Sequence, residues 1–446
     1  MISRRLAEFA AALRYDDVPP MVRNRAKRLA LDAIGCGLAA KRFDFARAAL
    51  QAIAALAGSG PRGVLGHAER LPLRDAALAN GILMHGLDYD DTHSEGVVHL
   101  TVAVLPAVLA LGAELDRSGR EVLTAYIAGL EAGARIASAA KGGFHKAGFH
   151  PTGVVGAFAA AIAAGKLYGL DVPSLVNAQG AALSVAAGSL EFLEDGSWTK
   201  RLHAGWAGVG GITAAALARG GFVAPGAAYE GRFGLFSLYL DAPPEDAERA
   251  TAGLGATWET LNVAVKPFPA CHFVHAFADA AIALRRKGVE PEQVASLTAL
   301  VPEPEIAVIC EPAANKRRPA NDYDAKFSLP YVVAASLRAG RFGLAELEPG
   351  ALADAATLEL AAKVGYRVDP DSSFPRHYSG ELIARLADGR EVRHREAVNR
   401  GAADRPLGNA EVEEKFMQNA GAPKIRDAVL AMETRSAREL EEALVG

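Results

Sequence analysis

The chain has few cysteines for its length, and this limits the classes of protein to which it can belong. Only Cys36, Cys271 and Cys310 occur among 446 residues, far apart and in no Cys-x-x-Cys pair. An odd, scattered set argues against a disulfide framework or a zinc site. Glu8 and Arg14 interrupt what would be the apolar part of a signal peptide. We therefore expect a protein of the reducing cytoplasm.

The chain also lacks a charge imbalance and a long apolar run. Its 48 Lys and Arg residues nearly balance 52 Asp and Glu residues, so composition does not predict binding to nucleic acid or to an anionic membrane. The longest charge-free apolar runs, such as 153–165, fall short of the ~20 residues that a membrane span needs. We expect neither a nucleic-acid partner nor a membrane partner.

Motifs for two large enzyme classes are missing as well. No Gly-x-Gly-x-x-Gly follows a predicted strand, and no Gly-x-x-x-x-Gly-Lys-Ser/Thr is present. The Gly-x-Ser-x-Gly turn of many serine hydrolases is also absent. Nucleotide binding and serine hydrolysis therefore have little support.

Hydrophobic periodicity predicts helices through most of the first 265 residues. The expected helices are 3–16, 21–40, 45–57, 73–86, 101–116, 120–138, 153–168, 173–187 and 204–219. Their many Ala and Gly residues suggest helices that pack at close range. With half of all residues hydrophobic, a sizeable core is assured.

The pattern changes after Pro267. Short β-branched runs predict strands at 294–301 and 306–309, and 380–394 has the alternation of a hairpin with its turn at Asp388-Gly389. Helices are expected at 324–338, 351–364, 409–419 and 423–445. The sequence thus predicts a mainly α fold, in which a large all-helical domain built from both chain ends (1–265 and 404–446) carries a smaller inserted α+β domain (266–403).

One polar stretch lies between two apolar segments. It reads His85-Gly-Leu-Asp-Tyr-Asp-Asp-Thr-His93 and precedes the charge-free helix 101–113. Polar groups held in a core must be hydrogen-bonded, so the stretch is either a structural network or a reaction site. Its three aspartates, Asp88, Asp90 and Asp91, can alternatively cap the following helix. A magnesium site on them would need a second acidic cluster, and none is found, so we expect no metal.

Four further stretches contain histidine, lysine or arginine and no acidic residue: 141–153, 196–205, 265–275 and 315–318. If they converge, His99, His150, Lys200, Arg201 and Lys266 line a cationic cleft suited to a small polycarboxylate. The structural alternatives are that Lys200 and Arg201 form a solvated corner and that Cys271, His203, His272 and His275 are core residues.

Eight segments, taken together and in order, resemble the MmgE/PrpD family, which includes 2-methylcitrate dehydratase, cis-aconitate decarboxylase and iminodisuccinate epimerase. The segments are 31–35, 77–81, 85–93, 148–153, 200–205, 265–269, 327–331 and 406–409. The resemblance implies a large helical domain formed by both chain ends, an inserted α+β lid domain, a homodimer, and no metal or organic cofactor.

The resemblance also implies site residues. Asp88 and Thr92 match the family's active-site acid and hydroxyl, His99 matches its histidine, and the lysines match further site positions. Where the family usually has Pro after that histidine, this chain has Leu100. The implied catalytic residues are Asp88, His99 and His150, and the implied substrate-binding residues are Thr92, Lys200 and Lys266.

The expected activity is that of a cofactor-independent lyase acting on a small di- or tricarboxylate by abstraction of a proton α to a carboxylate. A 2-methylcitrate dehydratase type is our first reading, with an epimerase or a decarboxylase as alternatives and a non-catalytic carboxylate-binding protein as a remoter one. In this hypothesis Lys200 and Lys266 hold the substrate carboxylate, because fixed cations stabilise the charge that develops there. His99 and His150 act as acid and base while Asp88 orients an imidazole, although the roles of Asp88 and the histidines can be exchanged.

Overall fold

A computed structural model describes residues 1–374 and 376–445. The chain divides into two compact units, one formed by Met1–Val265 together with the chain from Gly408 onward, the other by Lys266–Leu407. The chain therefore returns to the first unit at Gly408, where the sequence pattern had suggested 404. Helices make up 59% of the structure and strands 9%, which confirms the mainly α class.

The first unit is built from helices and short connecting strands. Its longer helices are α1 (Ile2–Ala12), α2 (Pro20–Ala40), α3 (Asp44–Ala57), α4 (Leu73–His85), α5 (Thr101–Glu114), α6 (Gly119–Ala139), α8 (Pro151–Tyr168), α9 (Val172–Ala182) and α11 (Thr199–Arg219). Shorter helices are α7 (Gly143–Lys146), α10 (Phe192–Asp195) and α12 (Leu235–Tyr239), with 3-10 turns at Tyr15–Asp17, Ala247–Thr251 and Glu259–Asn262. Two small antiparallel pairs join β1 (Arg62–Gly63) to β2 (Arg70–Leu71) and β3 (Thr92–His93) to β4 (Val263–Ala264).

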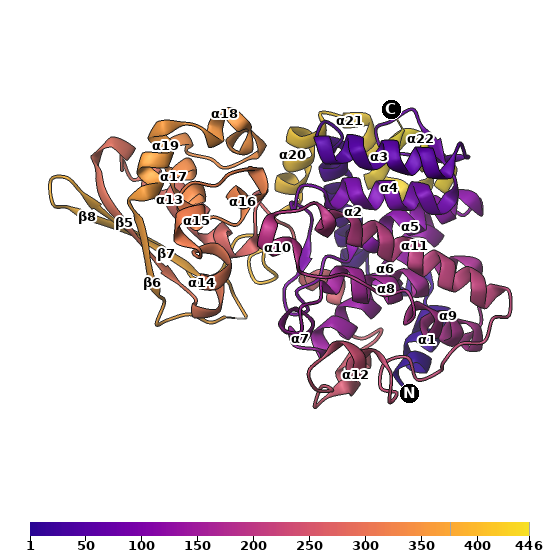
Figure 1. Ribbon diagram of the computed structural model, residues 1–446. Coiled ribbons are helices and arrows are strands. Elements are labelled where there is room, and N and C mark those ends of the chain that lie inside the picture. Colours follow the sequence, from indigo (N-terminus) through magenta and orange to yellow (C-terminus); the bar gives the residue numbers. More distant parts are fainter. Residues whose placement is uncertain (375, 446) are drawn as a thin grey trace. The chain divides into compact units, whose positions relative to one another are not determined.

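Helix α8 lies at the centre of this unit, against α5, α6 and α11 (Figure 1). Almost every residue of α8 is buried, because the helix is apolar all round and must be covered on every side. Within the described residues it is the one helix long and apolar enough to cross a membrane, and 89% of that window is buried inside the structure. Its length and apolar character are thus those of a core helix.

Small residues let α11 approach α4 closely. A Cβ atom built on Gly81 would lie 2.4 Å from the Cα atom of Gly205, a distance that real side chains do not tolerate. This contact sets the start of α11 beside the end of α4. It confirms that the Ala and Gly content of these helices serves close packing.

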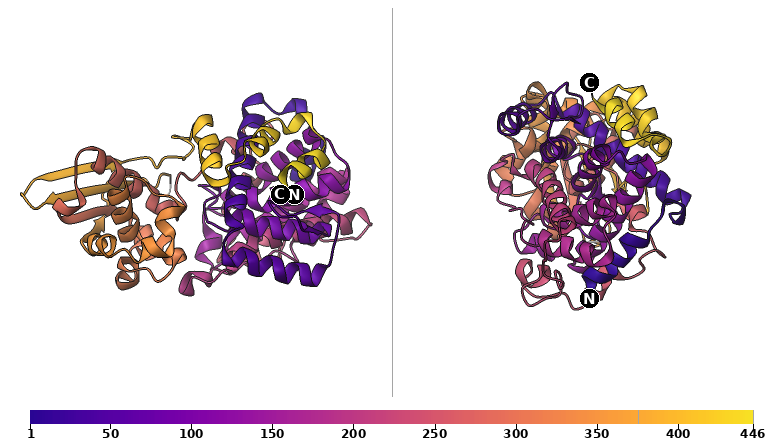
Figure 2. Two further views of the ribbon diagram at one scale, coloured as in Figure 1. Left: turned by 90° about the horizontal axis from the view of Figure 1, so that it is seen from above. Right: turned by 90° about the vertical axis from the view of Figure 1, so that its right-hand side faces the viewer.

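The C-terminal helices α20 (Asn409–Ala420), α21 (Pro423–Leu430) and α22 (Ala437–Leu444) pack against the first half of the chain. Figures 1 and 2 show them in yellow beside the indigo N-terminal helices, with α20 on α2 and α22 on α5. A buried ion pair joins Lys415 of α20 to Asp32 of α2 at 2.7 Å. The helical unit therefore needs both ends of the chain.

The second unit is α+β. Its sheet has the order β6-β5-β7-β8, in which β5 (Val294–Val301) pairs in parallel with β6 (Val364–Val368) and antiparallel with β7 (Gly380–Leu386), and β7 pairs with β8 (Glu391–Glu396). Helices α13 (His275–Arg286) and α17 (Leu329–Ala339) contact one another and the sheet. The shorter helices are α14 (Glu303–Ile309), α15 (Ala313–Arg317), α16 (Asp322–Lys326), α18 (Pro349–Leu352) and α19 (Ala355–Ala362), with 3-10 turns at His272–Val274, Pro291–Gln293 and Leu344–Leu347.

Several predicted elements are confirmed and others need correction. The strand at 294–301 and the hairpin with its turn at Asp388-Gly389 are present. The strand predicted at 306–309 is wrong, because these residues end α14, whose N-terminal Glu303-Pro304 favours a helix start. The helix predicted at 423–445 is interrupted by the 3-10 turn Met432–Thr434, and α11 begins at Thr199, ahead of the predicted 204.

Candidate active site

Helix ends of the first unit bring the polar residues together. His85 is the last residue of α4, His99 lies two residues before α5, His150 is the N-cap residue of α8, and Lys200 and Arg201 lie in the first turn of α11. Helix ends leave backbone groups without intrahelical partners, so polar groups gather there at little cost to the core. The four helices thus place a polar cluster within an apolar unit.

The loop from Gly86 to His99 carries most of the acidic groups and has two unusual backbone conformations. Asp88 has φ 52° and Val97 has φ 48°. Aspartate tolerates this left-handed region, whereas a β-branched residue there is strained by about 1–3 kcal/mol. Hydrogen bonds from His93 N–H to Val98 O (2.9 Å) and from Val98 N–H to His93 O (3.3 Å) hold the turn that contains Val97. The strained turn fixes the position of His99, two residues before α5 begins.

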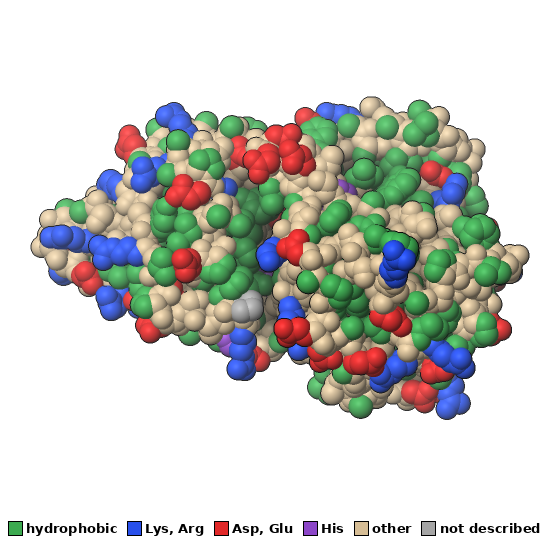
Figure 3. Space-filling view, turned by 60° about the horizontal axis from the view of Figure 1, so that its bottom comes forward, with side chains coloured by type: hydrophobic (Ala, Val, Ile, Leu, Met, Phe, Trp, Pro, Cys, Tyr) green, Lys and Arg blue, Asp and Glu red, His purple; other side chains and the backbone are tan. Residues whose placement is uncertain are grey.

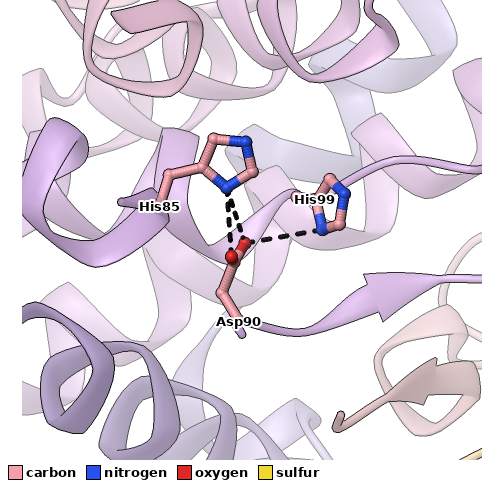
Figure 4. Close-up of side chains that lie close together, drawn as sticks. All are labelled: His85, Asp90 and His99. Carbon is pink, nitrogen blue, oxygen red and sulfur yellow. Dashed lines mark hydrogen bonds and ion pairs between the residues drawn. The ribbon is translucent and has the colours of Figure 1, made fainter. Parts of the chain in front are cut away.

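Asp90 lies between two imidazoles. His85 Nδ1 is 3.0 Å from both carboxylate oxygens of Asp90, and His99 Nδ1 is 3.5 Å from Oδ2. Figure 4 shows both rings turned toward this carboxylate. The side chains of His85 and Asp90 are fully buried. A buried carboxylate in contact with two imidazoles orients both rings.

His99 has further partners that fix its tautomer. Its Nδ1 is 2.7 Å from the carbonyl oxygen of Asp91 and 3.2 Å from the hydroxyl of Thr92. A carbonyl oxygen can only accept, so His99 Nδ1 carries the proton and its Nε2 carries the lone pair in the neutral ring. The backbone N–H of His99 donates to Thr152 Oγ1 at 3.1 Å. The contacts of Nδ1 and the backbone hydrogen bond therefore hold this residue in place.

His85, Asp90 and His99 are close enough together for their ligand atoms to hold a metal ion. The two ring nitrogens that face Asp90 do not fit one. Metal ligation needs a bare lone pair on the ligating nitrogen, whereas His99 Nδ1 must carry a proton to bond the Asp91 carbonyl. We read the three residues as a hydrogen-bonded group, and no step below passes through a metal.

Lys200 is buried and ion-paired. Its Nζ atom lies 2.7 Å from Asp88 Oδ1, and the two side chains are 9% and 4% exposed. Arg201 Nε donates to the carbonyl oxygen of Gly86 at 2.7 Å, and its guanidinium lies over the ring of Phe45. The solvated-corner alternative for Lys200 and Arg201 is therefore wrong. Asp88 thus pairs with Lys200, and Asp90 is an aspartate that contacts imidazoles.

His150 belongs to a second group of imidazoles. Its Nδ1 is 3.0 Å from His203 Nδ1, and its ring is parallel to that of His85 within 15° at a centroid distance of 5.7 Å. Burial, and then the positive charge of Lys200, lower the pKa of His150 well below its usual value. Burial likewise lowers the pKa of His203 to about 4 and that of His145 to about 4. These imidazoles are neutral near pH 7.

The properties of Asp91 are not those of a helix-capping residue. Burial raises the pKa of its carboxyl group well above the usual range. Helix α5 begins after Leu100, which makes no side-chain hydrogen bond at the cap, and neither carboxyl oxygen of Asp91 has a hydrogen-bond partner among the described residues, so Asp91 does not cap this helix. Burial thus favours the neutral form of the Asp91 carboxyl group, and the carbonyl oxygen of Asp91 is the group that positions His99.

The structure brings five of the six sequence-derived site residues into the first unit. Asp88, Thr92, His99, His150 and Lys200 are all buried there. Lys266 is the first residue of the second unit, two positions after the strand residue Ala264 that pairs with Thr92.

Sequence reasoning missed the importance of His85, Asp90 and His203. His203 was assigned a structural role, yet it bonds His150 directly. A signal existed for His85 and Asp90, because both lie in the polar stretch 85–93. Their pairing across a loop is, however, a tertiary fact.

The comparison with known proteins defines the class of protein. The N-terminal MmgE/PrpD domain matches residues 4–247, and the C-terminal MmgE/PrpD domain matches residues 268–436. The chain is similar to a cis-aconitate decarboxylase of Aspergillus terreus, at 31% identity over 75% of this chain and 71% of that protein. It is also 29% identical to the cis-aconitate decarboxylase of Mus musculus, over 97% of this chain and 89% of that protein. The identity to the cis-aconitate decarboxylase of Homo sapiens is 29% as well, over 100% of this chain and 93% of that protein.

These matches and the helical unit with its inserted α+β unit define a lyase. The chain belongs to the MmgE/PrpD family.

Proposed function

We propose that this protein is a cofactor-independent lyase of a small di- or tricarboxylate, and that it releases CO₂ from a substrate of the cis-aconitate type. The observation that supports this most is the buried cluster of His85, His99, His150 and Lys200. It combines one fixed cation with several imidazoles in a desolvated place, where electrostatic interactions are strong. The named activity of the relatives supports decarboxylation over the dehydration that the sequence first suggested.

The proposed reaction shifts one pair of electrons along the substrate. When the C–CO₂⁻ bond of the CH₂ group breaks, its electrons form a new double bond to the neighbouring carbon. The electrons of the old double bond then move to the far carbon, which lies next to another carboxylate and takes up a proton. The enzyme must therefore stabilise negative charge beside a carboxylate and deliver one proton.

Lys200 is suited to hold that carboxylate. Its ammonium group is already desolvated and paired with Asp88, so a substrate carboxylate can share the cation without a large change in hydration. Thr92 adds a hydroxyl group next to His99. We propose that Lys266 of the second unit supplies a further cation, as the resemblance implies. Loss of one such donor typically lowers the rate by about 10²–10³-fold.

His99 and His150 are the proposed acid and base. His150 is neutral near pH 7 because burial and Lys200 lower its pKa. A bound tricarboxylate reverses that effect, since an opposite charge nearby favours the imidazolium form. Substrate binding should therefore favour protonation of His150, and that proton can be delivered to carbon.

The alternative lyase reading, a 2-methylcitrate dehydratase, uses the same groups in another order. There a base removes the proton α to a carboxylate and an acid protonates the departing hydroxyl group. An epimerase needs only the proton transfer. The products formed distinguish these three reactions. A carboxylate-binding protein without catalytic activity would form no product at all.

Proton NMR of the protein in D₂O with cis-aconitate, 2-methylcitrate, citrate and iminodisuccinate tests the proposal. We expect cis-aconitate to lose CO₂, with one solvent deuterium entering the product. The variant Lys200→Met should lower kcat by about 10²-fold or more. Lys166→Met is the matched control, because Lys166 binds only the carbonyl oxygens of Ala10 and Leu13 in its described contacts. Water loss from 2-methylcitrate with no change in cis-aconitate would establish the dehydratase instead.

We also propose that the protein is a cytoplasmic homodimer with no nucleic-acid or membrane partner. Trp198, the N-cap residue of α11, and Leu202 and Trp206 within α11 follow one another at four-residue spacing and are 50%, 41% and 46% exposed. Such a stripe is typical of an interface. Basic and acidic side chains are intermixed on the face shown in Figure 3, so that face has no block of basic charge for a nucleic acid to bind.

Trp206→Glu tests the dimer by sedimentation velocity. We expect a monomer at concentrations where the native protein is dimeric, and an unchanged sedimentation coefficient would move the interface elsewhere. Fractionation of the producing cell tests the location.

A further inference from the structure

No step of the proposed reaction has yet been assigned to the pair formed by His85 and Asp90. Both side chains are fully buried, and His85 Nδ1 lies 3.0 Å from each oxygen of the Asp90 carboxylate. A carboxylate only accepts, so Nδ1 carries a proton. In the neutral ring the lone pair is then on Nε2.

His85 Nε2 is buried and has no hydrogen-bond partner among the described residues. A buried polar atom without a partner is costly, and such atoms in native proteins call for an explanation. His93 shows the contrast a few residues away, because its Nε2 contacts Glu259 and its Nδ1 accepts from the N–H of Gly96. His93 is a fully satisfied structural histidine, whereas His85 keeps one nitrogen available.

The neighbours of His85 place it within the candidate active site. Its ring centroid is 5.0 Å from that of His99 and 5.7 Å from that of His150. Figure 4 shows Asp90 on one edge of the His85 ring and the second nitrogen on the opposite edge. An imidazole with a carboxylate on Nδ1–H and a bare Nε2 has the arrangement of a general acid–base group, because the carboxylate fixes the tautomer and stabilises the imidazolium.

We propose that His85 is a catalytic residue, and that it carries the proton of the lyase reaction on Nε2 while Asp90 positions it. As CO₂ leaves, the C–CO₂⁻ electron pair becomes a new C=C bond and the old C=C pair forms a C–H bond with the Nε2 proton of His85. When substrate is bound, a proton from solvent first converts the resting neutral ring to the imidazolium, and the ring returns to neutral imidazole as that proton passes to carbon. The step needs no oxidant or further reactant. It rests on the proposed function and refines it, because His85 takes the place of His99 or His150 as the group that hands the proton to carbon.

Chemical rescue of an alanine variant tests this proposal. We expect His85→Ala to lower kcat on cis-aconitate by about 10²–10⁴-fold and added imidazole to restore turnover in proportion to its concentration. His93→Ala is the matched control, a buried histidine with a carboxylate partner that should show no imidazole-dependent gain. For the positioning residue, Asp90→Asn should lower kcat with little change in KM.

The outcomes separate the two proposals. A native protein that leaves cis-aconitate and the other carboxylates unchanged overturns the proposed function, and the role of His85 with it. An active native protein whose folded His85→Ala variant keeps its kcat, or loses it without rescue by imidazole, overturns only the role of His85.

A second measurement covers variants that fail to fold. ¹⁵N NMR of histidine-labelled native protein should show one buried ring that is protonated at Nδ1 and bare at Nε2, with an Nε2 signal that moves when cis-aconitate is added. The signal is assigned to His85 by its loss in His85→Gln or, if that variant also fails to fold, by selective labelling near α4. The opposite tautomer would refute the proposal.

Discussion

The ion pair between Lys415 and Asp32 gives the sharpest test of how the C-terminal segment supports the candidate site. Lys415 Nζ lies 2.7 Å from Asp32 Oδ1, 2.7 Å from the carbonyl oxygen of Tyr89 and 3.8 Å from the centre of the Tyr89 ring. The side chains of Lys415 and Asp32 are 5% and 1% exposed. Because Tyr89 lies between Asp88 and Asp90, one lysine joins α2, α20 and the loop of the candidate site.

The cost of Lys415→Met follows from the fate of Asp32. Burial already raises the pKa of Asp32, and the Lys415 ammonium opposes that rise. Without the ammonium the carboxyl group takes up a proton in the folded state, while it stays ionised in the unfolded state. One pKa unit corresponds to about 1.4 kcal/mol, and pH 7 lies about three units above the ordinary pKa of Asp, so this contribution reaches at most about 4 kcal/mol at pH 7. That agrees with the about 3–5 kcal/mol typical of a broken buried pair.

The pH dependence has a definite sign. The folded variant binds a proton that its unfolded state does not bind, so stability is lost as pH rises above the ordinary pKa of Asp. At pH 5 the same contribution shrinks to about 1.5 kcal/mol. Urea denaturation followed by circular dichroism at pH 5 and pH 7 measures both values. We also expect kcat to fall, because the loop that carries Asp88 and Asp90 loses an anchor.

The double variant Asp32→Asn/Lys415→Met provides the control. It should be more stable than Lys415→Met alone at pH 7, since no buried carboxyl group is left without a counter-ion. Equal deficits at pH 5 and pH 7, or a double variant whose loss equals the sum of the two single losses, would refute the reasoning.

Three further predictions address other parts of the molecule. Glu305 of α14 is fully buried, neither carboxyl oxygen has a hydrogen-bond partner among the described residues, and burial raises its pKa well above the usual value. Between the ordinary and the raised pKa, stability should therefore fall by about 1.4 kcal/mol per pH unit as pH rises, and Glu305→Gln should flatten that slope in thermal melts. Gly81→Ala should destabilise the helical unit by about 1–3 kcal/mol, because its Cβ atom would lie 2.4 Å from Gly205 Cα, whereas Gly350→Ala, where a Cβ atom would meet nothing within 4 Å, lacks that clash. Treatment with EDTA should leave turnover unchanged, and a loss restored by a divalent cation would contradict the assignment of His85, Asp90 and His99 to a hydrogen-bonded group.

Local patterns in the sequence were enough to assign the fold class. The 3.6-residue repeat of apolar positions marks helices such as α2 and α6, which bury one face, and a continuous apolar run marks α8, which is buried on all faces. Asp388-Gly389 marks the hairpin turn, since few residue pairs adopt that backbone. The strand predicted at 306–309 was wrong because a short apolar run is compatible both with a strand and with a buried helix. The preceding Glu-Pro favours the helix only when the surrounding structure is known.

The site was recognisable as a set of residue types, and its connections were not. Five of the six expected residues gather in the first unit, and the polar stretch 85–93 identified the loop that carries two of them. The sequence could not say that Asp88 pairs with Lys200, 112 positions away, or that His150 bonds His203 across 53 positions.

What the sequence alone determined is therefore periodicity, turn chemistry and the supply of acids, imidazoles and cations in polar stretches between apolar helices. Tertiary structure decided which carboxylate meets which base, because pairing depends on where helix ends stop in space. It also decided the protonation states, since the low pKa of His150 and the high pKa of Asp91 come from burial by residues distant in sequence. The sequence places these titratable groups at the ends of helices, and burial in the folded protein then sets their pKa values.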